Sequence, residues 1–228
     1  MRILVTAGNT QTPIDAVRCL TNIFTGRTGA RIAMEAFGRG HDVVLLTSHP
    51  ETASDAPLDM RAYRTFDDLH ALLAKLVPAG MFDAIIHSAA VGDYALAGVH
   101  SGPRAEPLLT LPALKIKSTH SELWMRFVPT PKLVDLIRTA WGFRGVLVKF
   151  KLEVGIGDDE LIAICKRSRA HSDADLLVAN TLAGYEREAL LIDRADSAER
   201  VGRLEMPALL LDRIERIFSA TDRASAVK

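Results

Sequence analysis

Short β-rich runs alternate along this chain with segments whose apolar residues recur at helical spacing, and this alternation limits the folds open to it. Residues 2–6 (RILVT) and 42–47 (DVVLLT) are two such β-rich runs. Between them, residues 28–37 carry apolar side chains three and four residues apart, as in an amphipathic helix, and Gly38 and Gly40 end that pattern. A strand, a helix and a strand in this order build a parallel sheet, so we expect an α/β fold.

The alternation continues through the rest of the chain. We expect further strands at 60–66, 82–88, 146–150, 174–180, 188–193 and 200–206, and helices at 67–77, 131–141, 158–169 and 207–218. Thr130 and Pro131 have the residue types of an N-cap and a first helical position. The last two strands have no helix between them and are expected to be antiparallel. The sequence therefore predicts a Rossmann-like, doubly wound and mostly parallel sheet with a mixed C-terminal edge, in one domain spanning 1–228.

One long segment lacks any sustained period. Between residues 93 and 119 the chain holds two glycines and three prolines but no strand or helix pattern. An unpatterned loop of this length in a compact domain is usually functional or disordered. We interpret residues 93–119 as a flap over the site.

Charge and composition exclude several classes of protein. Lys plus Arg equal Asp plus Glu at 28 each, so the overall charge gives no reason to expect a nucleic acid or a membrane as partner. No apolar run approaches the ~18 residues of a membrane span. Cys19 and Cys165 lie far apart without metal-ligand spacing. We expect both thiols to be buried, no metal site built from protein ligands, and a cytoplasmic location.

Ligands of doubly wound sheets bind at the carboxyl ends of the strands, so residues 7–9, 88–93, 150–153 and 179–181 should face one crevice. Gly8, Gly26 and Gly29 could bring backbone N–H groups close to anionic oxygens there. Their spacing does not match the glycine fingerprint of dinucleotide-binding proteins, because residues 9–25 intervene. A short-chain oxidoreductase using NAD(P) remains an alternative, although none of the three tyrosines has the lysine four residues on that its chemistry requires.

Six segments in order resemble the phosphopantothenoylcysteine synthetase (phosphopantothenate–cysteine ligase) family, and the resemblance covers nearly the whole chain. The first is ILVTAGNTQTPIDAVRCLTNIFTGRTG, with its glycine turn and its Thr-Asn and Thr-Gly-x-x-Gly steps. HSAAVGDY, LKIKST, TPK, FKLEV and ADLLVAN follow at similar intervals. The length resembles that of the stand-alone, single-domain members of this family.

The resemblance implies a reaction in two steps. The carboxylate of 4′-phosphopantothenate attacks the α-phosphorus of a nucleoside triphosphate, and L-cysteine then displaces the nucleotide from the acyl-nucleotidylate, as in coenzyme A biosynthesis. It implies Mg²⁺ held largely by the triphosphate, slightly favours CTP over ATP, and implies a homodimer. A paralogue of the family that binds a nucleotide without ligating is a second alternative.

The resemblance also implies roles for individual residues. Asn22 would contact the acyl-nucleotidylate, Lys115 would close over the triphosphate from the flap, and Arg18 would clamp a phosphate or carboxylate. The resemblance implies nucleotide-binding roles for Lys115 and for ten further residues, Gly8, Ala89, Ala90, Asp93, Lys132, Leu133, Val134, Phe150, Arg167 and His171. The chain departs from the family pattern at Asn9, Lys149, His171 and Thr181, where the family has a glycine, a small residue, a lysine and an aspartate.

Overall fold

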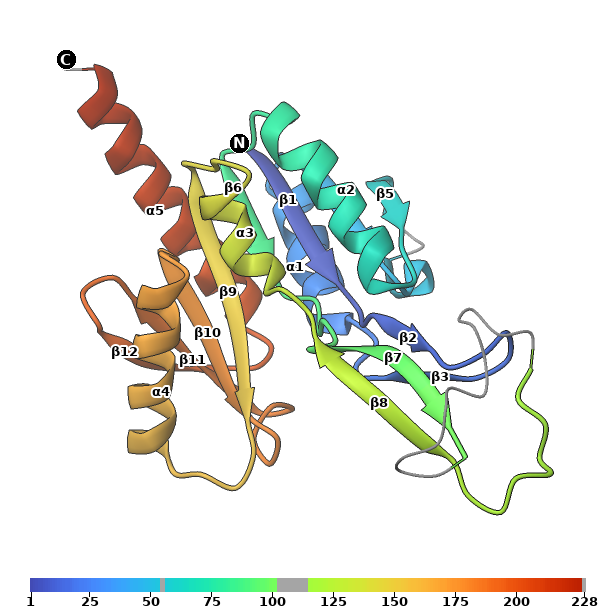
Figure 1. Cartoon of the computed structure of the whole chain (residues 1–228). Coiled ribbons are helices and arrows are strands. Elements are labelled where there is room, and N and C mark those ends of the chain that lie inside the picture. Colours follow the sequence, from blue (N-terminus) through green and yellow to red (C-terminus); the bar gives the residue numbers. More distant parts are fainter. Residues whose placement is uncertain (54–55, 102–114, 227–228) are drawn as a thin grey trace.

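The computed structural model describes residues 1–53, 56–101 and 115–226 and has an eight-stranded central sheet (Figure 1). The strand order is β12-β11-β10-β9-β6-β1-β4-β5. The strands β1 (Arg2–Ala7), β4 (Asp42–Thr47), β5 (Asp59–Ala62), β6 (Ala84–His87), β9 (Val146–Glu153) and β10 (Leu176–Thr181) are parallel, and β11 (Glu188–Asp193) and β12 (Ala198–Gly202) are antiparallel. The predicted fold class and its mixed C-terminal edge are confirmed.

Helices cover both faces of the sheet. On one face, α1 (Arg27–Gly38) and α5 (Met206–Ala226) pack over a core that includes Ile3, Val5 and Val148. On the other face, α2 (Phe66–Ala79) and α3 (Leu133–Thr139) cover Leu4 and Leu147, and α4 (Asp158–His171) covers a neighbouring cluster. Alternate residues of β1 and β9 thus point to opposite layers, as expected for strands buried on both faces. In the part of the chain that the structure describes, no helix is both long and apolar enough to cross a membrane.

The order of the strands fixes where ligands can enter. The chain runs from β1 to β4 and β5 on one side, returns to β6 on the other side of β1, and continues to β9 and β10. The order therefore reverses between β1 and β6, and the carboxyl ends of these two strands border a crevice. Two hairpins extend from this end of the sheet, β2 (Gln11–Pro13) with β3 (Cys19–Thr21), and β7 (Tyr94–His100) with β8 (Trp124–Pro129) (Figure 1).

Several predicted boundaries need correction. The expected strand at 60–66 ends at Ala62, because Thr65 forms a capping box with Asp68 and starts α2. The helix expected from Pro131 to Trp141 is shorter, Leu133–Thr139, because the Thr130 hydroxyl donates to the carbonyl of Gly92 instead of capping the helix. The strand expected at 200–206 is β12, and the last helix is longer than the predicted 207–218.

The predicted flap at 93–119 is wrong in its first part. Residues 94–100 form β7, which pairs with β8, and residues 102–114 lie outside the described residues. The four hairpin strands were not predicted at all. Cys165 is buried as expected, whereas Cys19 is exposed on β3.

Three polar side chains form a buried row across neighbouring strands. Thr6, His87 and Lys149 stand opposite one another on β1, β6 and β9. A hydrogen bond of 3.1 Å joins Thr6 Oγ1 and His87 Nδ1. Lys149 Nζ donates to Ser172 Oγ over 2.5 Å, and Ser172 Oγ donates to Asp135 Oδ1 over 2.5 Å. Lys149, a departure from the family pattern, is therefore linked to a carboxylate on α3 through the hydroxyl of Ser172, the buried C-cap residue of α4.

Burial, and then the charge of Lys149, lower the pKa of His87 from 6.5 to about 4. In the unfolded chain His87 takes up a proton near pH 6.5, whereas in the folded chain it stays neutral until the pH falls to about 4. The stability that neutral His87 contributes is complete above pH 6.5 and is lost as the pH falls toward 4.

We expect acidification from pH 7.5 to 4.5 to cost about 2 to 3 kcal/mol of unfolding free energy through this side chain alone. Urea unfolding of the wild type and of His87→Gln at both pH values measures it, because glutamine stays neutral throughout. The wild type should lose more stability than the variant. Equal losses would show that His87 does not titrate as its surroundings imply.

Candidate active site

A cavity of about 560 Å³ opens at the carboxyl ends of β1, β6, β9 and β10. Small-molecule sites typically enclose ~300 to 1,000 Å³, so this volume suits a ligand of nucleotide size. All four strand ends that the sequence predicted to face one crevice contribute to its wall. Its lining includes Gly8, Gly26, Gly29, Ser88, Ala89, Ala90, Phe150, Lys151, Leu152, Asn180, Tyr185 and Glu186.

Gly8 and Gly26 allow the end of β1 and the start of α1 to approach each other closely in the wall of this cavity. Gly26 is the N-cap of α1 and has a φ of 81°, a backbone conformation that residues other than glycine rarely adopt. A Cβ on Gly26 would lie 2.1 Å from the backbone nitrogen of Gly8. The close approach leaves the first N–H groups of α1, which have no acceptor within the helix, next to the cavity. The predicted use of Gly8, Gly26 and Gly29 to build an anion cradle fits this geometry.

Asn22 adjoins the cavity and is held by its neighbours. Its Nδ2 donates to the carbonyl oxygen of Ala90 over 3.0 Å. Asn9 Nδ2 donates to the backbone oxygen of Asn22 over 2.8 Å, and the backbone nitrogen of Asn9 donates to Ser48 Oγ over 2.9 Å. The departure from glycine at position 9 thus places an amide that fixes the backbone of the predicted catalytic asparagine.

The structure places Arg18 and Lys115 by the hairpins, outside the residues that line the cavity. Arg18 donates to the buried carboxylate of Asp15 from Nε over 3.0 Å and from Nη2 over 2.5 Å. Arg18, and then the backbone N–H of Ile116, hold the pKa of Asp15 far below its usual value. Ile116 is itself buried, at 3% exposure, while Lys115 beside it is exposed. The pair Asp15–Arg18 therefore ties the segment that carries Lys115 to the β2–β3 hairpin.

A second group of predicted residues lies along α3 and α4. Lys132 Nζ contacts Asp93 Oδ1 at 2.5 Å, and both side chains are 58% exposed. Leu133 is buried in the core below α3, and Val134 is half-buried. None of these four residues lines the 560 Å³ cavity.

Arg167 and His171 lie on the last turns of α4, and both are exposed. His171 Nε2 contacts Asp135 Oδ2 at 3.3 Å, the carboxylate that also accepts from Ser172. Of the predicted nucleotide-binding residues, the structure thus brings Gly8, Ala89, Ala90 and Phe150 together in the cavity. The other predicted nucleotide-binding residues do not line this cavity, namely Asp93, Lys115, Lys132, Leu133, Val134, Arg167 and His171.

Residues that the sequence analysis missed complete the cavity wall. Arg27, Arg31 and Arg203 line it, and Tyr185 packs its ring against Phe24 in an edge-to-face contact with centroids 5.7 Å apart. Arg27 and Arg31 are four residues apart at the start of α1, a spacing that places both on one helix face and could have been noticed. Nothing in the sequence around Arg203, at the C-terminal edge, points to this site.

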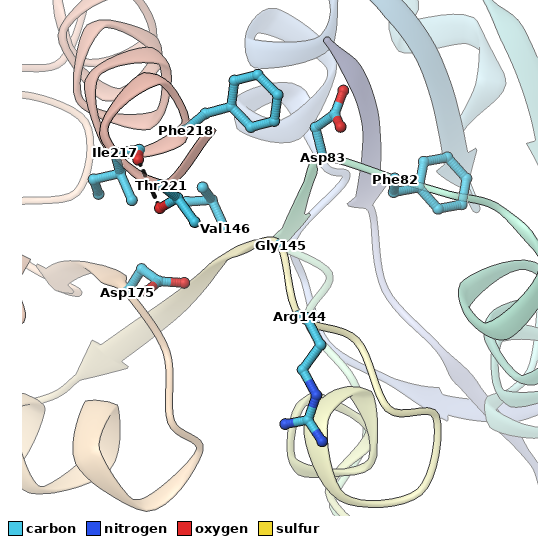
Figure 2. A pocket seen from close by; sticks show the side chains of 9 residues that line it. All are labelled: Phe82, Asp83, Arg144, Gly145, Val146, Asp175, Ile217, Phe218 and Thr221. Atoms are coloured by element: carbon cyan, nitrogen blue, oxygen red, sulfur yellow. Dashed lines mark hydrogen bonds between the residues drawn. The ribbon is translucent and has the colours of Figure 1, made fainter. Parts of the chain in front are cut away.

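A second cavity, of about 200 Å³, lies at the amino ends of β6, β9 and β10 and is shown in Figure 2. Phe82, Phe218 and Val146 give it an apolar wall, and Asp175 lies at its rim. Asp175 is already paired with Arg138 at 2.8 Å and Arg194 at 2.7 Å. This second cavity is small for a nucleotide. It also lies at the amino ends of the strands, whereas ligands of this fold bind at the carboxyl ends. Among the described residues, no group of three or more His, Cys, Asp or Glu side chains could hold a metal ion.

Comparisons with known proteins agree with the fold and the motifs. Residues 1–214 match the family model described as "DFP: DNA/pantothenate metabolism flavoprotein C-terminal domain". The coenzyme A biosynthesis bifunctional protein CoaBC of Thermococcus kodakarensis is 32% identical over 95% of this chain and 51% of its own length. Its counterpart in Mycobacterium bovis is 27% identical over 86% of this chain and 44% of its own. The chain thus spans about half the length of the curated relatives it matches.

Solved structures are similar to nearly all of the chain. The DNA/pantothenate metabolism flavoprotein from Streptococcus pneumoniae superposes with a TM-score of 0.82 at 29% identity, covering 95% of this chain and 99% of that one. A mutant of Cab2 in complex with phosphopantothenate-cysteine gives a TM-score of 0.75 at 17% identity over 97% of this chain and 88% of that one, which shows a shared fold. These matches confirm the family resemblance seen in the sequence. By its motifs, its fold and the match over residues 1–214, the chain belongs to the family of the C-terminal domain of DNA/pantothenate metabolism flavoproteins.

Proposed function

We propose that this chain is a ligase that joins 4′-phosphopantothenate to L-cysteine through an acyl-nucleotidylate. The observation that carries the proposal is the position of Asn22, bonded to the carbonyl of Ala90 at the edge of a nucleotide-sized cavity. The match of residues 1–214 to the family model supports it, as does the similarity to coenzyme A biosynthesis proteins.

The proposed chemistry needs positioning more than proton transfer. A carboxylate oxygen of phosphopantothenate attacks the α-phosphorus, the bond from that phosphorus to the bridging oxygen breaks, and pyrophosphate leaves with the electron pair. The neutral amine of cysteine then attacks the acyl carbon and loses a proton to water. The bond from that carbon to the phosphate oxygen breaks, and the nucleoside monophosphate leaves with the electron pair. Charge develops on phosphate oxygens in the first step, and fixed N–H donors and cations stabilise such charge.

The side chains near the cavity suit these roles. Asn22 offers a donor and an acceptor without a charge, so it can orient the acyl-nucleotidylate. Arg18 uses Nε and Nη2 on Asp15 and Ile116, and its Nη1 makes no hydrogen bond to a described residue. Asp15 therefore holds the guanidinium plane while Nη1 remains available to a substrate oxygen. Lys115, which is exposed, supplies a cation from beside the anchored Ile116.

Magnesium enters this scheme as part of the substrate. Glu186 is the one carboxylate among the described residues lining the cavity, and Mg²⁺ commonly keeps several waters while bound to phosphate oxygens. We therefore propose the magnesium salt of the triphosphate as substrate. Phe150 beside the backbone of Ala89 is suited to contact the base of either CTP or ATP, with CTP slightly favoured by the family pattern.

Pyrophosphate release tests the ligase. Purified protein with Mg²⁺, L-cysteine, 4′-phosphopantothenate and either CTP or ATP should release pyrophosphate only when phosphopantothenate is present. Asn22→Ala should lower that release to background, because it removes the proposed contact to the intermediate. The variant should keep the wild-type thermal unfolding temperature, since Asn22 is exposed.

The control is Asn180→Ala in the same cavity, which should weaken nucleotide binding and leave coupling measurable at saturating nucleotide. Wild-type rates from Asn22→Ala would remove that residue from the mechanism. Folded wild type that binds nucleotide but releases no pyrophosphate would favour the second candidate, a paralogue that binds without ligating. The departures at Asn9 and His171, each already bonded to a neighbouring residue, are the observations in its favour.

Exposed apolar side chains on the two hairpins support a homodimer. Leu20 on β3 is 53% exposed, and Tyr94 on β7 and Trp124 on β8 are 56% and 47% exposed. Clusters of large apolar side chains on an otherwise ordinary surface often mark interaction sites. We propose that these hairpins meet their counterparts in a second copy, next to Arg18 and Lys115.

Light scattering should report the mass of two chains. Trp124→Glu, which places a charge in the proposed contact, should shift the protein toward one chain. Met81→Glu is the matched control, because Met81 is 86% exposed and precedes β6 at the opposite end of the sheet, and it should leave the dimer intact. A wild type with the mass of a single chain at working concentration contradicts the proposal.

A further inference from the structure

Arg203 differs from the other shielded arginines of this chain. In the described ranges, each of the other buried or half-buried arginines pairs with a carboxylate, namely Arg2, Arg39, Arg61, Arg138, Arg169 and Arg213. Arg203 is half-buried and forms no ion pair with any described residue. Its cationic group is therefore shielded from water without the partner that such groups usually have.

The side chain of Arg203 is directed at the active-site cavity. It follows β12, and its Nη2 donates to Thr28 Oγ1 in the first turn of α1. Arg203 thereby joins Arg31 and Arg27 in the wall of that cavity. Neither of these two arginines forms an ion pair within the part of the chain that the structure describes. Three cations from two distant segments thus converge on one hollow.

This arrangement is electrostatically unfavourable without an anion. Burial, and then the nearby charge of Arg31, lower the pKa of Arg203. A bound anion would offset both effects, because it attracts each cation and replaces part of the lost hydration. The first N–H groups of α1 beside Thr28 would add donors to the same anion.

The number of cations indicates which anion fits. A phosphomonoester such as that of 4′-phosphopantothenate carries at most two charges on one phosphorus, whereas pyrophosphate and the end of a triphosphate carry more, spread over two. Guanidinium groups match phosphate oxygens as two-pronged donors. We propose that Arg203 and Arg31 bind the two terminal phosphates of the nucleotide, a role that rests on the proposed function.

The proposal has a consequence for the first chemical step. When the bond to the α-phosphorus breaks, the electron pair goes to pyrophosphate, whose charge rises. Arg203 and Arg31 would meet that charge where it forms. The same two side chains would hold free pyrophosphate, so pyrophosphate should compete with the nucleotide.

Calorimetric titration of the full chain with inorganic pyrophosphate and Mg²⁺ tests the site without any turnover. Arg203→Ala should weaken pyrophosphate binding by roughly tenfold or more, as expected for the loss of a charge-assisted hydrogen bond. Arg203→Lys should recover part of the affinity. Arg31→Ala, a substitution at an exposed position, should show the same loss and covers the case in which Arg203→Ala does not fold.

Two comparisons sharpen the test. Arg216→Ala removes an exposed arginine of α5 that lines a different cavity and should leave binding unchanged. Lys132→Ala removes a cation at the start of α3 to which the family resemblance gives a nucleotide-binding role, and its effect should be smaller than that of Arg203→Ala. Titration with 4′-phosphopantothenate alone should be insensitive to Arg203→Ala.

Unchanged pyrophosphate binding in folded Arg203→Ala and Arg31→Ala would overturn the inference, as would a loss confined to Lys132→Ala or to phosphopantothenate. The outcome is separable from that of the ligase proposal. A wild type that binds pyrophosphate through Arg203 but never couples cysteine would keep this site and lose the activity. A wild type that couples cysteine, together with an Arg203→Ala variant that binds pyrophosphate normally, would keep the ligase activity and remove Arg203 from the site.

Discussion

The close approach of Gly26 to Gly8 determines how the first helix meets the sheet. With any side chain at Gly26, α1 would have to move away from the end of β1, because a Cβ there overlaps backbone atoms of Ala7 and Gly8. The hydrogen bond from the backbone nitrogen of Ala90 to the carbonyl of Gly8, at 2.8 Å, joins the end of β6 to the same point. The cavity, the position of Asn22 and the direction of Arg31 all follow from this junction of three backbone segments.

Three of the four positions where the chain departs from its family, Asn9, Lys149 and His171, are bonded to other parts of the structure. Asn9 bonds to Asn22 and Ser48, and Lys149 donates to Ser172. Asp135 serves two of these departures, because it accepts from Ser172 and contacts His171. A buried lysine without such partners would cost several kcal/mol of desolvation. These departures therefore form local networks and do not loosen the fold, which is consistent with a divergent branch of the family.

The sequence predicted those elements whose pattern reflects burial. Strands β4 and β11 have the predicted bounds because all but their end residues are in the core. Strands β2, β3 and β8 escaped prediction because all their residues are exposed or half-buried, so they do not alternate between core and solvent. Strand β7 escaped prediction because its two buried residues, Gly98 and Val99, are neighbours in sequence and give no alternation. The start of α3 was misplaced because the Thr130 hydroxyl finds its acceptor, the carbonyl of Gly92, 38 residues away in sequence. In the site, the strand ends that line the cavity could be predicted from the strand pattern. The position of Arg203 could not, because it depends on how the antiparallel edge of the sheet packs against α1, and no local sequence pattern shows that packing.

The bond between Asp15 and the backbone nitrogen of Ile116, 3.0 Å long, acts as a fixed pivot for the lysine beside it. Ile116 is buried, and its nitrogen belongs to the same peptide group as the carbonyl of Lys115. Consecutive Cα atoms are about 3.8 Å apart, so the Cα of Lys115 must stay close to the anchored Ile116. The side chain of Lys115 therefore starts from a fixed point beside the β2–β3 hairpin. A charge anchored in this way acts on ligands near the hairpin and depends on Asp15 remaining ionised.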